Sequence, residues 1–161
     1  MTWEERRRAV QLMGFTERQA GFLVTVMLYG GVCLGRQYCT FGRIAYGQKM
    51  HDFFQSLLSR GYATARGCGH NRARLYHVHY KPLYRAIGEP NNRHRRPTTL
   101  ARAIERLMVL DAVLAEAGDD PDAGLYWLAR MLEAGGDAFI GKPISLKEFV
   151  ETVKRLIEGK K

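Results

Sequence analysis

The stretch GYATARGCGHNRARLYHVHY, residues Gly61–Tyr80, sets the expectation for the fold. Two segments rich in β-prone residues, Tyr62–Ala65 and Leu75–Val78, flank a turn rich in glycine and arginine. Short β-prone segments on both sides of a glycine-containing turn are typical of a β-hairpin. The sequence therefore predicts a two-stranded hairpin with a basic tip.

The residues before this hairpin have the apolar spacing of a helix. Apolar side chains recur three and four residues apart, at Met50, Phe53, Phe54, Leu57 and Leu58. Gly61 follows, and glycine is common just after a helix because it adopts the left-handed conformation easily. We predict a helix over Gln48–Arg60 with an apolar inner face and a polar outer face.

Capping patterns predict two helices near the start of the chain. In Thr2-x-x-Glu5 and Thr16-x-x-Gln19, a threonine hydroxyl and an acidic or amide side chain satisfy free backbone N–H groups. We expect the first helix to end near Gly14. The second carries many apolar residues, and we expect it to be largely buried and to end at Gly30-Gly31.

Two short elements are expected between these helices and the Gln48–Arg60 helix. Val32–Gly35 is β-prone, and Arg36–Tyr46 has the pattern of a short helix with Phe41 and Ile44 turned inward. The expected fold is therefore mainly α with a small β-hairpin, an α+β class.

Positive charge is concentrated in the first part of the chain. The net charge is +9; residues 1–97 hold 16 Lys and Arg against 5 Asp and Glu, and residues 98–161 hold 9 against 11. Such an asymmetry favours a polyanion-binding part followed by a neutral part with another role.

Composition also argues against export and membrane insertion. No apolar run with a cleavage site follows the first residues. The uncharged stretch Ala20–Gly35 is shorter than the roughly 20 residues that span a membrane. Three cysteines cannot all pair with one another, and we expect reduced thiols, with Cys33 and Cys39 in the core, in a cytoplasmic protein.

Over Thr16–Gly88, the sequence resembles bacterial winged helix-turn-helix regulators. The resemblance is carried by FFQSLLSRGYATA…RARLYHVHYKPLYRAIG. The Thr-x-x-Gln opening and the Tyr-x-Val strand leading into KPLYRAIG also resemble the replication-relaxation group of mobile-element proteins. The resemblance implies sequence-specific binding of double-stranded DNA, in transcription regulation or in replication or transfer of a mobile element. It also implies a recognition helix at Gln48–Arg60 and a wing at the hairpin.

A helix in the major groove reads bases through its outward polar side chains. The candidate DNA contacts lie on three segments. On and before the helix they are Arg36, Arg43, Gln48, Lys49, His51 and Gln55; on the wing, Arg66, His70, Asn71, Arg72 and Arg74; and in the segment NNRHRRP, Arg93, Arg95 and Arg96. We expect Arg72 and Arg74 to face the same side of the hairpin, with Arg66 completing a clamp across the turn.

Two of these assignments leave alternatives open. Asp52 repels phosphate, so it faces either a cytosine amine or a structural partner such as Arg43. The segment NNRHRRP is either a basic arm that follows the minor groove or an ordinary charged linker.

The hairpin also allows a zinc site, a weaker interpretation. Its ligands would be Cys68, His70, His77 and His79, but neither pair has the usual separation by two to four residues. We expect histidines that face the surface or DNA, and no cofactor. No P-loop, GxGxxG motif or nucleophile–base pair appears, so we do not expect an enzyme.

The stretch after the basic segment has a long apolar pattern. Residues 98–118 are expected to form one helix capped by Thr98 or Thr99, which either packs on the domain or makes a homodimer through Leu100–Leu114.

Residues 128–161 strongly resemble the end of a response-regulator receiver domain, in which a strand leads into a Lys-Pro pair, here Lys142-Pro143. In that family the lysine of this pair contacts the phosphoryl group, so the resemblance implies this role for Lys142 alone. The strand ending in a phosphorylatable aspartate is missing, so we do not expect phosphotransfer.

The expected organisation is a winged helix over 1–90, a basic linker over 91–97, the long helix over 98–118 and a helix–strand–helix tail over 119–161. The alternative function is a signalling or protein-interaction module without a role on DNA.

Overall fold

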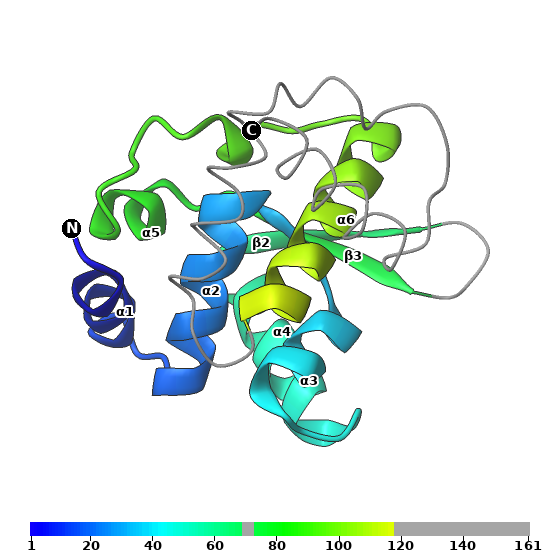
Figure 1. The fold of residues 1–161 in the computed structure, drawn as a ribbon, viewed down its shortest axis with the longest axis horizontal. Helices are drawn as coiled ribbons and strands as arrows, with labels where there is room; N and C mark the ends of the chain where they lie inside the picture. Colours follow the sequence, from blue (N-terminus) through cyan, green and yellow to red (C-terminus); the bar gives the residue numbers. More distant parts are fainter. Residues whose placement is uncertain (69–72, 118–161) are drawn as a thin grey trace, which may run out of the picture. The chain divides into compact units, whose positions relative to one another are not determined.

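The computed structural model describes residues 1–68 and 73–117. The chain divides into two compact units, Met1–Leu110 and Asp111–Lys161. The first unit is mostly helical with a small antiparallel sheet, in agreement with the expected α+β class (Figure 1). The predictions for His70, Asn71, Arg72, Lys142 and the tail 119–161 lie outside the described residues.

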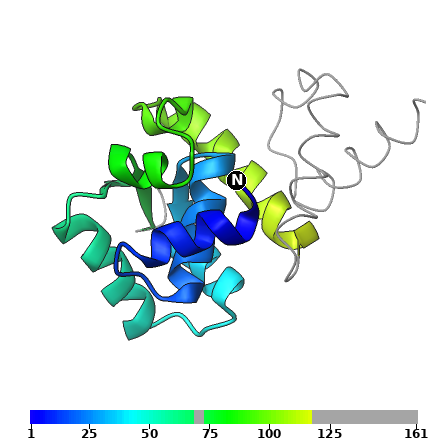
Figure 2. The same ribbon diagram turned by 90° about the vertical axis from the view of Figure 1, so that its left-hand side faces the viewer.

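The first two helices begin where the capping patterns place them. Helix α1 spans Trp3–Gln11 and helix α2 spans Glu17–Tyr29, and the capping boxes of Thr2 and Thr16 are both formed. In Figure 2, α1 crosses in front of α2. Helix α2 is buried along most of its length because its apolar residues surround it.

The short elements after α2 differ in part from the expectation. Strand β1 spans Val32–Leu34, and helix α3 spans Gly35–Gly42, which is shorter than the predicted Arg36–Tyr46. Arg43 takes the left-handed conformation, with φ 50° and ψ 44°, and this ends the helix. Ile44 therefore lies beyond the helix, while the half-buried Phe41 packs on Phe22.

The predicted helix and hairpin are both present. Helix α4 spans Gln48–Ser59, and strands β2 and β3 span Ala63–Gly67 and Arg74–Val78. At the end of α4, the Gly61 N–H donates to the Leu58 carbonyl and the Tyr62 N–H to the Leu57 carbonyl, as in a Schellman motif. Gly61 has a φ of +68°, as the predicted cap requires.

The hairpin is part of a three-stranded sheet in the order β1-β3-β2. Residues that pair across antiparallel strands point to the same face of the sheet. One face therefore carries Cys33, Ala63, Ala65, Tyr76 and Val78, and the other carries Val32, Leu34, Thr64, Arg66, Leu75 and His77.

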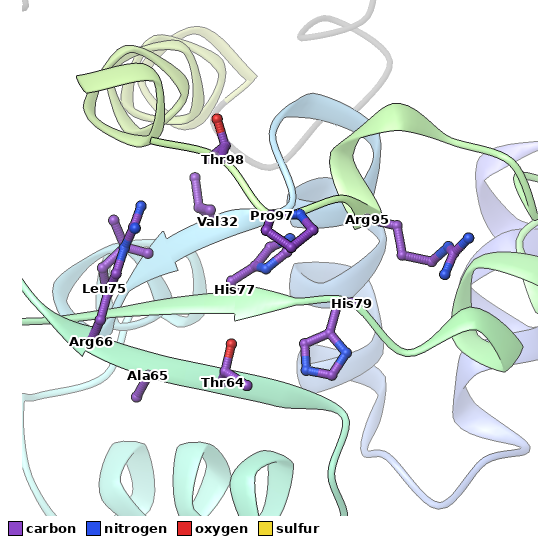
Figure 3. A pocket seen from close by; sticks show the side chains of 10 residues that line it. All are labelled: Val32, Thr64, Ala65, Arg66, Leu75, His77, His79, Arg95, Pro97 and Thr98. Atoms are coloured by element: carbon purple, nitrogen blue, oxygen red, sulfur yellow. The ribbon is translucent and has the colours of Figure 1, made fainter. Parts of the chain in front are cut away.

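Each face of the sheet is covered by helices. Tyr76 stacks on Phe54 of α4, with ring centroids 4.0 Å apart. On the other face, Val32 and Leu75 form a cluster with Ala103 and Leu107 of helix α6, Leu100–Ala117. Figure 3 shows the strands with α6 on one side and α4 on the other. We call these the α4 face and the α6 face.

Two further elements lie between β3 and α6. Helix α5 spans Lys81–Ala86, and the short 3-10 helix η1 spans Arg93–Arg95 within the predicted linker. Helix α6 is capped by Thr99, whose hydroxyl accepts from the Arg102 N–H. The packing of Ala103 and Leu107 confirms that the helix contacts the domain.

Within the described residues, no helix is long and apolar enough to cross a membrane. All three cysteines are free. Cys33 is fully buried, as expected, and burial raises the pKa of its thiol. Cys39 is only half-buried.

Candidate nucleic-acid interface

Helix α4 presents the predicted polar face to solvent. Its inner residues Met50, Phe53, Phe54 and Leu57 are buried, and Gln48, Lys49, His51, Asp52 and Gln55 are exposed. The helix begins after Gly47, which offers no side chain to cap it. Free N–H groups at a helix start attract anions such as phosphate. The helix thus combines a polar face with an anion-attracting end.

Asp52 has a hydrogen-bond partner on its own helix. The Gln48 side chain donates to an Asp52 carboxylate oxygen over 2.6 Å. Binding of a base by Gln48 would compete with this bond, whereas Gln55 carries no such bond among the described hydrogen bonds. Gln55 is therefore the better placed of the two amides for contact with a base edge.

The exposed ring of Tyr46 is a candidate contact that the sequence reasoning missed. It lies just before α4, is 67% exposed, and its centroid is 5.7 Å from that of His51 in an edge-to-face arrangement. A single exposed aromatic is common on protein surfaces, so it is the place of Tyr46 beside the polar side of α4 that makes it a candidate. Its position before the predicted helix was the only sequence clue.

The predicted wing arginines divide between the two faces of the sheet. Arg74 lies on the α4 face, where its guanidinium is 5.8 Å from the centre of the Tyr76 ring. Arg66 pairs with Leu75, and Gly67 pairs with Arg74, so Arg66 points to the α6 face. The prediction that Arg66 and Arg74 form a clamp is wrong. The two arginines belong to adjacent residue pairs of the hairpin, and adjacent pairs point to opposite faces of the sheet.

The other predicted arginines also fall into separate groups. Arg36 and Arg43 are exposed at the two ends of α3. Arg93 and Arg96 are exposed, and Arg95 is half-buried, on and just after η1. The chain between α5 and α6 therefore contains an ordered turn rather than an extended arm.

The segment η1 is fixed to the sheet through His94. The His77 ring donates from Nε2 to the His94 carbonyl over 2.9 Å. Gly31 lies so close that a Cβ atom there would be 2.4 Å from the same oxygen. Next to it, Arg106 of α6 donates to the Gly30 carbonyl over 3.3 Å. The Gly30-Gly31 pair thus accommodates both η1 and α6.

No zinc site is present among the described residues. His77 and His79 lie on one face, as predicted, with ring centroids 5.7 Å apart. Within residues 1–68 and 73–117, no group of three His, Cys, Asp or Glu is placed to hold a metal. His70, the fourth predicted ligand, lies outside the described residues.

Acid is expected to destabilise the fold through His94. Burial lowers the pKa of His94 to about 4, and the charges of Arg106 and Arg93 act in the same direction. Burial also lowers the pKa of His77. The unfolded chain then binds more protons below about pH 6.5 than the folded chain, so stability falls from there towards pH 4. We expect His94 to contribute about 1 kcal/mol of this loss, because its ring is only partly buried.

Urea unfolding of the wild type and of His94→Gln over a pH series measures this effect. The variant should lose less stability between pH 7 and pH 4, since it lacks the titrating ring. Parallel profiles for the two proteins would show that His94 does not carry the acid sensitivity.

No protein-family model, curated protein or solved structure matches the chain. The resemblances to winged-helix regulators, to replication-relaxation proteins and to a receiver domain therefore stay predictions.

Proposed function

We propose that the first unit is a winged helix that binds double-stranded DNA in a sequence-specific manner. The observation that carries the proposal is that α4, whose polar side faces solvent, and β3, which carries Arg74, are held together by the Phe54–Tyr76 stack. The order α2, β1, α3, α4, β2, β3 supports a winged helix-turn-helix, in which α4 is the recognition helix.

The exposed side chains of α4, together with Arg74, have the chemistry of DNA contacts. Gln55, Lys49 and His51 offer hydrogen-bond groups to base edges in the major groove. Arg74 and the start of α4 are suited to phosphate. Only one exposed carboxylate lies on α4, and Gln48 donates to it. The exposed side of α4 and the neighbouring Arg74 are thus complementary to a polyanion that carries sequence information.

Selection from random duplexes, followed by binding of variants over a salt series, tests this function. Arg74→Ala should weaken binding to selected and scrambled duplexes alike and reduce the salt slope by about one charge. Gln55→Ala should reduce the preference for the selected duplex by about 1–3 kcal/mol. Phosphate contacts carry no sequence information, whereas base contacts do.

Arg66→Ala serves as the matched control, because Arg66 is an exposed arginine of the same hairpin on the α6 face. It should change the affinity for both duplexes much less than Arg74→Ala. Unchanged affinity and salt slope in Arg74→Ala, or no sequence preference in the selection, would contradict the proposal.

We also propose that two chains associate through the Leu100–Leu114 helix. Ala103 and Leu107 are used against the sheet, while Leu100 and Ile104 stay 39% and 45% exposed. Two such domains would bind two half-sites.

Sedimentation at about 10–100 μM, a scale typical of weak association, should show a dimer that Ile104→Lys dissociates. A monomeric wild type would overturn this arrangement.

A further inference from the structure

The α6 face contains a cavity that the proposed DNA contacts do not use. It has a volume of about 400 Å³, at the lower end of the range for small-molecule sites. Figure 3 shows it along the β2 side of the sheet, where α6 does not cover the strands. Its lining is formed by Val32, Thr64, Ala65, Arg66, Leu75, His77, His79, Arg95, Pro97 and Thr98.

This shape follows from the sheet and its cover. Helix α6 packs on the β1 and β3 side chains Val32 and Leu75. The bond from His77 to the His94 carbonyl fixes the chain that leads to Pro97 and Thr98. The β2 side chains Thr64 and Arg66 are exposed beside them. The cavity is therefore bounded by elements that the fold itself holds in place.

The lining has cationic, hydroxyl and apolar groups but no carboxylate. In Figure 3, Arg66 rises at one end of the cavity and His79 lies at the other, with the Thr64 hydroxyl between them. Val32, Leu75 and Pro97 supply apolar surface. Arg95 lines the cavity, but its side chain extends away from the centre in this view. One guanidinium beside a hydroxyl and an apolar wall suits a ligand with one anionic group.

Arg66 is available for such a ligand. Within the described part of the chain, none of the ion pairs includes Arg66. It also faces away from α4 and Arg74, so a duplex bound by α4 and Arg74 does not account for it. A planar guanidinium binds a carboxylate with two parallel hydrogen bonds, which makes this group its natural partner.

We propose that this cavity binds a small carboxylate with an apolar body. The carboxylate pairs with Arg66 and accepts from the Thr64 hydroxyl, and the apolar body lies against Val32, Leu75 and Pro97. The proposal does not depend on DNA binding, and its test contains no DNA.

Titration of the full chain with benzoate, followed by amide NMR, tests the site. Benzamide is the matched neutral probe, because it has the same ring and nearly the same shape without the charge. Millimolar benzoate should shift the amide signals of Thr64, Arg66 and Leu75 saturably, and benzamide should not. Equal shifts with both probes, or none with benzoate, would overturn the proposal.

Two variants locate the binding. Arg66→Gln should weaken benzoate binding by about tenfold, since it removes a charge-assisted hydrogen bond. Arg74→Gln is the control, as it removes an exposed arginine of the neighbouring strand on the α4 face. It should leave the benzoate affinity unchanged. Equal loss in both variants would mean general charge attraction and refute a site at Arg66.

Discussion

Replacing Phe53 by alanine is expected to lower the free energy of unfolding by about 3–5 kcal/mol, the range for large aromatic truncations in a core. Phe53 is 2% exposed, and its ring centroid lies 4.4 Å from that of Tyr38 and 5.0 Å from that of Phe54. The rings of Phe15 and Phe22 also meet it, nearly edge-on. Removing it leaves a cavity between α2, α3 and α4 that these stiff rings cannot fill by small movements.

Chemical denaturation of Phe53→Ala and of Gln55→Ala measures this effect. Both residues lie on α4, so Gln55→Ala is the control for a change on the same helix. Gln55 is exposed two residues further along α4, and its loss should change stability by no more than about 0.5 kcal/mol. The pair also separates folding from recognition, since Gln55→Ala is the variant expected to alter sequence preference. A Phe53→Ala protein as stable as Gln55→Ala would show that α4 is not anchored by this ring cluster.

The second large effect is expected from Gly31→Ala, at about 2–4 kcal/mol of lost stability. Gly31 has a φ of +71°, which disfavours any side chain. The added Cβ would also lie 2.4 Å from the His94 carbonyl oxygen and 3.0 Å from its carbon. Either the turn after α2 or η1 must move, and the His77–His94 hydrogen bond is expected to break.

Two other glycines separate these causes. Gly61 has a similar φ of +68° with nothing within 4 Å of an added Cβ, so Gly61→Ala should cost about 1 kcal/mol from the backbone alone. Gly47 has an extended backbone, with a φ of 171°, and no close neighbour, so Gly47→Ala should cost no more than about 0.5–1 kcal/mol, from the preference for glycine over alanine at a helix N-cap. If thermal or urea unfolding gave equal losses for Gly31→Ala and Gly61→Ala, the contact with His94 would carry no energy.

The elements set by local chemistry were predictable from the sequence. Thr2 and Thr16 cap helices because each needs only a partner three residues away. The inner face of α4 and the glycine at its end follow from spacing and from one backbone preference. The hairpin was also predicted, since β-prone residues flank a glycine-rich turn, but β2 spans Ala63–Gly67 instead of Tyr62–Ala65 and β3 begins at Arg74, one residue before the predicted Leu75.

Features that depend on distant contacts were not predictable. Gln37 is fully buried, with its side chain accepting from the Leu34 N–H and donating to the Leu107 carbonyl, which lies 70 residues away. No local pattern marks such a bridge to α6. The face taken by Arg66 depends on the hairpin register, which the turn fixes and the strand composition does not. The cavity depends in addition on where α6 stops covering the sheet.

The position of β3 has a consequence for synthesis of the chain. Among the described strands, β1 and β2 each pair with β3, which is the last of the three to be translated. When β2 has emerged from the ribosome, β1 and β2 both still lack a strand to pair with. The sheet can form only after Val78 has emerged. The β2–β3 pairing then closes a short loop, while the β1–β3 pairing closes a longer one around α3 and α4 at a greater entropic cost. Formation of the hairpin is thus the local step. It provides the strand edge on which β1, a three-residue strand translated much earlier, can then pair.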